Sequence, residues 1–203
     1  SPNLKPEKSN QFEIGTRGKW WRLSWDSAYF LTHAKDFISL TVDVPGGTST
    51  NENLSRVRIY GVESSLNLDI GSGFSAFFQH TLTRGRNSDT KVPIDSVMPV
   101  EIVWGLGYEI GSFSAQLDNR YVMAQKRVED SDNATSGAMV WNIGLNYDLP
   151  DFEQNELFLF DEMKLHVGVE NIFDHAYRDH LSSANVYAPA RNFVAKVSKS
   201  FKF

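Results

Sequence analysis

Apolar and polar side chains alternate with a period of two along much of the chain. The clearest stretch is 139–149, where the odd positions carry Met, Trp, Ile, Leu, Tyr and Leu while the even positions after Val140 carry Asn, Gly, Asn and Asp. Residues 101–110 and 113–121 show the same split. Because successive side chains of a β-strand point to opposite faces, this pattern predicts antiparallel strands with one apolar and one polar face.

Weaker alternation predicts further strands, giving about nine in all and almost no helix. These further strands are expected at 11–18, 20–31, 57–70, 74–83, 163–173 and 192–203. Short connections containing glycine, which favour tight hairpin turns, fall at 17–19, 71–73 and 111–112.

The alternate connections are long and rich in Asn, Asp, Ser, Thr, Gly and Pro. They are expected at 32–56, 84–99, 124–137 and 174–191. The predicted sheet therefore has short connections at one end, here called the trimmed end, and long connections at the other. The segment 150–162 is an exception, since it is a longer linker on the trimmed end and the sequence offers no explanation for it.

Two architectures share this alternation: a soluble β-sandwich or small barrel with its apolar face inward, and a membrane barrel with its apolar face outward. Predicted strands of about 10 to 13 residues exceed the usual length of about 5 to 6 and match the length needed to cross a hydrocarbon core. Aromatic residues also gather near the strand ends, as interfacial girdles require. They are Trp20, Trp21, Phe74, Phe113, Tyr121, Tyr147, Phe193, Phe201 and Phe203. The fold predicted is an all-β, transmembrane antiparallel β-barrel.

Composition narrows the function classes. The 203 residues carry a formal charge of −5 with a pI near 5.5, and no basic, aromatic-rich stripe is present, so nucleic acid is not an expected partner. The absence of cysteine excludes thiolate metal ligands, a cysteine nucleophile and disulfides. No G-x-S-x-G motif appears, and no spaced set of serine, carboxylate and histidine surrounds His33 or His80, so an enzyme is not expected.

The last predicted strand ends on an aromatic residue. One face of this strand carries Phe193, Ala195, Val197, Phe201 and Phe203, and the other carries Asn192, Lys196, Ser198, Ser200 and Lys202. In a soluble protein Phe203 would be only a hydrophobic end in the core. In a membrane barrel it anchors the strand at the interface, and a C-terminal phenylalanine of this kind is a signal for the barrel assembly machinery.

Several motifs resemble the C-terminal part of the barrel of TonB-dependent receptors. The segment SPNLKPEKSNQFEIGTRG (1–18) resembles the family stretch NPxLKPE-x-S-x-x-x-E-x-G, with Ser1 where Asn is usual. The segments AYFLTHAKDFISL (28–40) and NLSRVRIYGVESSLNL (53–68) resemble a long strand and a strand containing GVE. The segments VGVENIFDHAYRDHLS (167–182) and ARNFVAKVSKSFKF (190–203) resemble the last two strands, so the resemblance covers essentially all of 1–203.

The resemblance implies a 22-stranded barrel in the outer membrane of a Gram-negative bacterium, with a plug domain inside it that meets the TonB-ExbB-ExbD energising complex. About nine strands would be the C-terminal portion of such a barrel. Their unpaired edges are not tolerated in hydrocarbon, so remaining strands and the plug are expected as further chain or as another chain. Ser1 is then either a mature terminus or the start of a fragment.

The function implied is active import of a metal chelate, with a ferric siderophore favoured over haem and copper; a passive outer-membrane porin is the alternative. No resident cofactor or metal is expected. The polar strand faces would line the lumen and contact the plug through Glu63, Glu101, Gln116, Asp118, Arg120, Asn142, His166 and Glu170.

The long loops offer cations and imidazoles to an anionic chelate. The candidate substrate contacts are Arg84, Arg86, Arg127, His175, Tyr177, Arg178 and His180. His175 and His180 flank Tyr177, an arrangement that suits haem or copper. The two histidines are an odd five residues apart and no further ligands are visible in the sequence, so no metal site is assigned.

Overall fold

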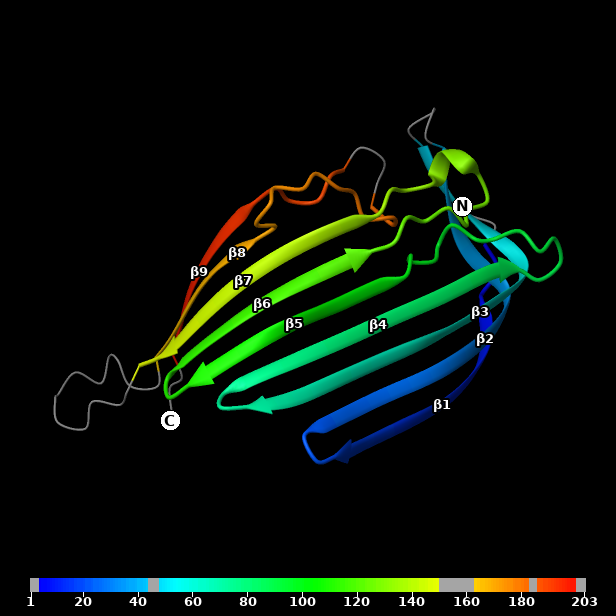
Figure 1. Cartoon of the computed structure of the whole chain (residues 1–203). Coiled ribbons are helices and arrows are strands. Elements are labelled where there is room, and N and C mark those ends of the chain that lie inside the picture. Colours follow the sequence, from blue (N-terminus) through cyan, green and yellow to red (C-terminus); the bar gives the residue numbers. More distant parts are fainter. Residues whose placement is uncertain (1–3, 44–47, 150–162, 183–185, 200–203) are drawn as a thin grey trace.

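The residues that the structure describes form one antiparallel sheet of nine strands that follow one another in sequence order (Figure 1). The computed structural model describes residues 4–43, 48–149, 163–182 and 186–199. The strands are β1 (Lys8–Trp20), β2 (Leu23–Asp43), β3 (Thr48–Gly71), β4 (Phe74–Asn87), β5 (Glu101–Ile110), β6 (Phe113–Val122), β7 (Ala138–Asp148), β8 (Met163–Glu170) and β9 (Asn192–Lys199). In these described ranges the helical content is a single 3₁₀ turn, η1 (Ser131–Asn133), and no helix is long and apolar enough to cross a membrane. The all-β prediction is confirmed.

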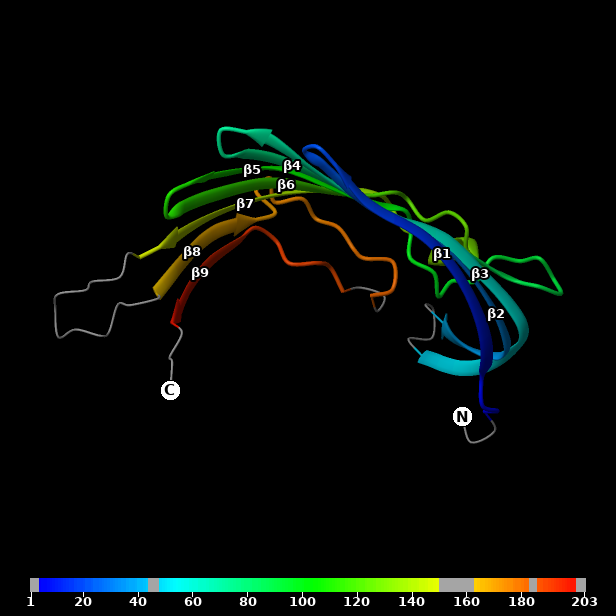
Figure 2. The same ribbon diagram turned by 90° about the horizontal axis from the view of Figure 1, so that it is seen from below.

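The sheet curves into a trough with a convex and a concave face (Figure 2). The tight turns after β1, β3 and β5 lie at one end, here called the turn end, and the longer connections after β4, β6 and β8 lie at the other, the loop end (Figure 1). The connection from β8 to β9, here called segment 171–191 and described at 171–182 and 186–191, runs along the concave side in Figure 2. The hollow is therefore occupied at the loop end by the protein's own loops.

The register of the strands separates the two faces. Gln116 of β6 lies opposite Gly107 of β5 and Gly144 of β7, and these three positions belong to the concave face. The same alternate positions stay opposite one another through every pair of strands. The other alternate positions of each strand carry large apolar side chains, which remain exposed on the convex face. They include Phe12, Ile14, Tyr29, Leu66, Leu68, Phe74, Phe78, Trp104, Leu106, Leu117, Met139, Ile143, Leu145, Tyr147, Val167 and Phe193. An exposed apolar face of this extent fits a wall against lipid and not the interior of a soluble sandwich.

The turns at 71–73 and 111–112 are confirmed, but the turn predicted at 17–19 is wrong. Arg17 to Lys19 continue β1, opposite Ser24 to Asp26 of β2, and the chain reverses at Trp21 and Arg22. Gly18 is needed for close packing, because a Cβ there would lie 2.3 Å from the ring of Trp25. At the reversal Trp21 takes a φ of 53°, and the Arg22 guanidinium lies over its ring and donates to the Ile70 carbonyl at 2.7 Å.

The long loop predicted at 32–56 is also wrong, since most of this segment extends the β2–β3 hairpin. The hairpin is held by a small packed core. Ala34 and Val57, which is 1% exposed, pack with Ile94 and Val97 from the loop after β4. Residues 92–94 pair with 85–87 beside β4 and bring Ile94 onto the concave side of the hairpin, so burial of apolar area stabilises strands that polar composition alone assigned to a loop.

The segment 150–162 and the predicted assembly signal Phe203 lie outside the described residues, as does the last part of the strand expected at 192–203.

Candidate functional site on the concave face

Amide and carboxylate groups form a ladder across β6 and β7 on the concave face. The Gln116 amide donates to Asp118 Oδ1 at 3.2 Å, and the Asn142 amide donates to Asp118 Oδ2 at 2.9 Å. Asn142 Oδ1 in turn accepts from the backbone N–H of Asn171 at 3.0 Å. Three of the residues expected to line the lumen are therefore joined, and their contacts lead directly into the segment after β8.

Asn171 holds segment 171–191 on this face. It is 3% exposed and takes a φ of 50°, a conformation that asparagine tolerates better than most residues. Its side chain donates to the carbonyls of His175 and Pro189 at 3.0 and 3.2 Å and accepts from the His175 N–H at 2.8 Å. A cavity of about 430 Å³ lies between the segment and the strands. The sequence reasoning missed Asn171, although an asparagine directly after a strand is a signal for such a turn.

Arg120 forms a second link between strand and loop. Its Nε and Nη2 atoms lie 2.9 and 2.7 Å from Glu101 Oε2, on the neighbouring strand β5. The same Nη2 lies 3.0 Å from Asp179 Oδ1 in segment 171–191. All three side chains are partly buried, so the arginine bridges two carboxylates in a shielded position.

The remaining lumen candidates share the face without joining this network. Nearer the turn end, His166 Nδ1 lies 2.7 Å from Asn146 Oδ1, and the Asn146 amide donates to Ser114 Oγ at 3.1 Å. Glu170 accepts from the Asn192 amide at 3.1 Å. Glu63, on β3, is exposed in the hollow. The register thus places all eight lumen candidates on the concave face.

Three loops meet at His180. Its Nε2 lies 2.9 Å from the Asp95 carbonyl in the loop after β4, and its Nδ1 lies 3.2 Å from Thr135 Oγ1 in the loop after β6. The Asp95 carboxylate also accepts from the Glu129 N–H and the Asn133 amide, both at 2.6 Å. Partial burial lowers the pKa of His180 below its ordinary value, and this outweighs the opposing attraction of Asp95. Both ring nitrogens of His180 are therefore engaged in contacts that join the three loops.

His175, Tyr177 and Arg178 do come together, in a groove of about 500 Å³ between the loop after β6 and segment 171–191. Residues 134–137 form one wall and Tyr187 contributes to the other. The rings of His175 and Tyr177 stack with an interplanar angle of 15° and a centroid distance of 6.4 Å. The groove therefore offers an imidazole, phenol rings and a guanidinium at the loop end of the hollow.

The other arginines predicted to contact substrate are not in this groove. Arg127 is exposed in the loop after β6. Arg84 and Arg86 belong to β4 and have the parity of Phe78, so the structure places them on the convex face. Within the described ranges, no group of three or more His, Asp or Glu side chains is arranged to hold a metal ion.

Comparison with known proteins agrees with this architecture. The chain is 31% identical over 106 residues to a hemin receptor of Yersinia pestis, an alignment covering 49% of the chain and 16% of the receptor. It is 26% identical over 207 residues to the vitamin B12 transporter BtuB of Vibrio vulnificus, covering 99% of the chain and 31% of the transporter. The solved structure of the copper transporter OprC superposes with a TM-score of 0.82 at 25% identity, covering 98% of the chain and 32% of OprC.

The chain thus spans about a third or less of the length of these relatives. The sequence profile described as TonB dependent receptor-like, beta-barrel matches residues 1–172. Together with nine consecutive antiparallel strands that carry an apolar outer face, this match shows that the chain belongs to the TonB-dependent receptor family and forms part of its β-barrel wall.

Proposed function

We propose that this chain is the C-terminal portion of an outer-membrane receptor that imports a metal chelate with energy from the TonB system. The observation that carries the proposal is the groove of His175, Tyr177 and Arg178, which opens where loops cover the hollow. A substrate arriving from outside would meet this groove before it reached the polar concave face. The loop end would then be extracellular and the turn end periplasmic.

The concave face suits a plug better than an open channel. Gln116, Glu63 and Glu170 are exposed to the hollow, where the amide can donate hydrogen bonds to a second protein surface and the carboxylates can accept them. We therefore expect Glu63, Glu101, Gln116, Asp118, Arg120, Asn142, His166 and Glu170 to line the lumen and contact the plug. The TonB-ExbB-ExbD complex would act through that plug, and the barrel assembly machinery would insert the protein into the outer membrane of a Gram-negative cell.

The groove favours an anionic, partly aromatic chelate. Arg178 supplies positive charge, while His175, Tyr177 and Tyr187 supply ring faces for stacking. Ferric siderophores with aromatic ligands and haem share this chemistry, and a copper species would use the imidazole. The relatives named above carry hemin, vitamin B12 and copper, each of which contains a metal. A ferric siderophore is the first substrate to test, followed by haem and copper.

The test is direct binding of chelates to the purified, assembled protein, together with growth of metal-starved cells on each chelate. Replacing both Tyr177 and Arg178 by alanine should weaken binding at least about tenfold, since a charged hydrogen bond and a stacking contact are lost. The control is Lys126→Ala, which removes one exposed cation of the neighbouring loop outside the groove. Equal loss in both variants would mean that loop charge, and not the groove, attracts the ligand.

Conductance separates import from passive diffusion. A receptor with a plug should show little ion conductance in planar bilayers and should bind a chelate tightly. High conductance with no chelate bound would favour the porin and overturn the proposal.

A further inference from the structure

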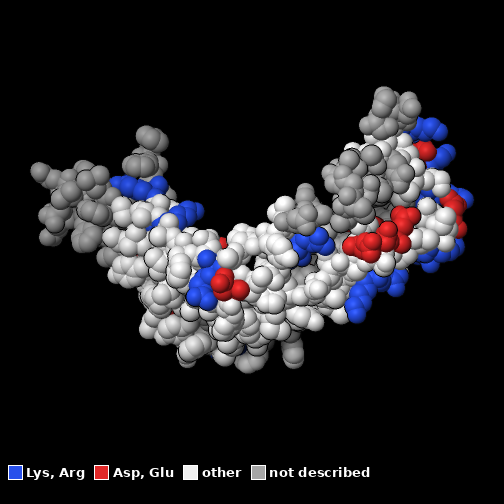
Figure 3. Space-filling model, turned by 90° about the horizontal axis from the view of Figure 1, so that it is seen from above, with Lys and Arg blue, Asp and Glu red and all other residues white. Residues whose placement is uncertain are grey.

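The convex face changes from apolar to basic near the loop end of β2, β3 and β4. Tyr29, Val62 and Leu82 lie opposite one another in the last fully apolar row. The next row is Leu31, Tyr60 and Arg84, and the row after it is His33, Arg58 and Arg86. Lys and Arg side chains, with some Asp and Glu among them, follow the outer edge of the right-hand arm in Figure 3. We call Arg58, Arg84 and Arg86 the arginine cluster.

The arginine cluster lacks counter-charges. Among the described residues, none of its three guanidinium groups forms an ion pair, and the Nε atoms of Arg58 and Arg86 are buried without a hydrogen-bond partner. Arg58 lies over the Tyr60 ring, 5.5 Å from its centroid, a contact that adds no acceptor.

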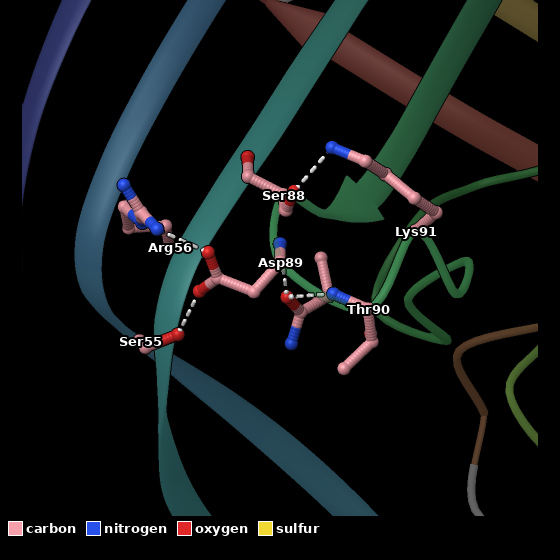
Figure 4. A network of polar contacts seen from close by, with 7 residues as sticks. Ser55, Arg56, Ser88, Asp89, Thr90 and Lys91 are labelled. Atoms are coloured by element: carbon pink, nitrogen blue, oxygen red, sulfur yellow. Dashed lines mark hydrogen bonds and ion pairs between the residues drawn. The ribbon is translucent and has the colours of Figure 1, made fainter.

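The neighbouring Arg56 shows the contrast. Figure 4 shows Asp89 accepting hydrogen bonds from Ser55 and Arg56, while Lys91 donates to the Ser88 carbonyl at 2.5 Å. The Asp89 carboxylate is thus directed to Arg56. Asp89 forms no ion pair with the arginine cluster, which lies one row closer to the apolar side chains of the convex face.

This arrangement is costly without a ligand. Arg58 and Arg86 are directly opposite on adjacent strands, where like charges repel. Their Nε–H groups are removed from water and unpaired, which carries a desolvation cost. An anion with several oxygen atoms offsets the repulsion between the two guanidinium groups, because guanidinium groups bind phosphate through paired hydrogen bonds.

We propose that the arginine cluster binds the phosphate of an anionic lipid headgroup in the outer leaflet. The cluster shares its face with the exposed apolar band and begins where that band ends, so an acyl chain lying on Leu82 or Val62 brings its headgroup to Arg84, Arg58 and Arg86. A soluble chelate in the hollow cannot reach this face. The inference rests on the proposed placement of the protein in an outer membrane with the loop end outward.

The test is native mass spectrometry of the assembled, detergent-solubilised protein titrated with diphosphoryl lipid A, the phosphorylated glycolipid of that leaflet. The wild type should retain the lipid, and the double variant Arg58→Gln, Arg86→Gln should bind it about tenfold more weakly or worse. Replacing both arginines by lysine should give intermediate binding, since the charge is kept and the forked geometry is lost. Inorganic phosphate at the same concentration should not displace the lipid.

Arg17→Gln is the matched control, since it removes an exposed arginine at the turn end, paired with Asp26 on the opposite face, and should leave lipid binding unchanged. Heat-dependent migration on gels reports whether each variant forms a barrel. Unchanged lipid A binding in a folded double variant would overturn the inference, as would displacement by inorganic phosphate. If the wild type forms no membrane barrel, the proposed function fails first; if it forms a barrel and binds chelate without retaining lipid A, only the lipid site fails.

Discussion

At the scale of single residues, Asn171 decides how segment 171–191 is attached. Replacement by glycine keeps the φ of 50° accessible but removes three side-chain hydrogen bonds, which should loosen the segment by about 2 to 3 kcal/mol. Replacement by alanine should cost about 1 kcal/mol more, because alanine is strained in the left-handed region. Hydrogen exchange of 171–182 measures both effects. Unchanged protection in Asn171→Gly would show that the side chain does not hold the segment.

His180 makes the meeting of the three loops dependent on pH. Its pKa in the folded protein is lowered from the ordinary value of 6.5, so the unfolded chain binds the proton more readily than the folded one. The stabilisation of the three packed loops by neutral His180 is therefore fully present above pH 6.5, and it is lost as the pH falls through the lower pKa of the folded protein. Exchange protection in 123–137 and 171–182, corrected for the intrinsic rate at each pH, should fall over that window. The variant His180→Gln should show no such step.

At this scale the sequence could predict which face of the sheet a side chain occupies, but not which residues it contacts. Period-two alternation was enough to put Asp118 and Asn142 on one face, because side-chain direction in a strand is a local property. That Arg120 bridges Glu101 and Asp179 depends on how a distant loop folds, which no local pattern records. Arg84 is a similar case, since the sequence suggested a loop while the ladder with β3 extends far enough to make it a strand residue on the convex face.

At the scale of elements, β7 allows the two faces to be compared directly. Ile143 is exposed on the convex face, whereas Asn146 points into the hollow and bonds Ser114 and His166. Ile143→Arg should destabilise the barrel by about 2 to 4 kcal/mol, since it places a charge in hydrocarbon. Asn146→Arg should cost about 1 kcal/mol, the value of the hydrogen bonds that it loses. Urea unfolding in lipid vesicles measures both, and equal costs would contradict an outward-facing apolar surface.

Asn119 shows why the existence of a strand was easier to predict than the contacts of its residues. It interrupts the apolar face of β6, yet it is 0% exposed and donates to the Val140 carbonyl at 3.3 Å. It lies opposite Trp104 and Trp141, whose rings meet edge to face at 5.0 Å. Three strands together therefore shield one amide from the surroundings. Alternation within β6 alone marks the position as an irregularity and gives no sign of the shielding.

At the scale of the whole molecule, architecture was predictable because it repeats. Each strand repeats the same two-faced pattern and each glycine turn the same reversal, so errors in single turns such as 17–19 did not change the fold expected. The extended β2–β3 hairpin was missed for a different reason. Its stability comes from Ile94 and Val97 packing on Ala34 and Val57, contacts between segments distant in sequence.

The outer strands of the sheet lead to a prediction about the complete protein. In the described ranges β1 pairs only with β2 and β9 only with β8, so each presents a row of backbone amides at an open edge. Hydrocarbon provides no partner for such groups, and a wall that stands in a membrane must have them paired by further strands. In the assembled protein, amides of 8–20 and 192–199 should therefore exchange as slowly as those of β5, which has partners on both sides. Hydrogen exchange with mass spectrometry in lipid nanodiscs measures this directly. Fast exchange of every second amide in β1 or β9, with β5 protected, would mean that the sheet stays open and that no closed barrel forms around a plug.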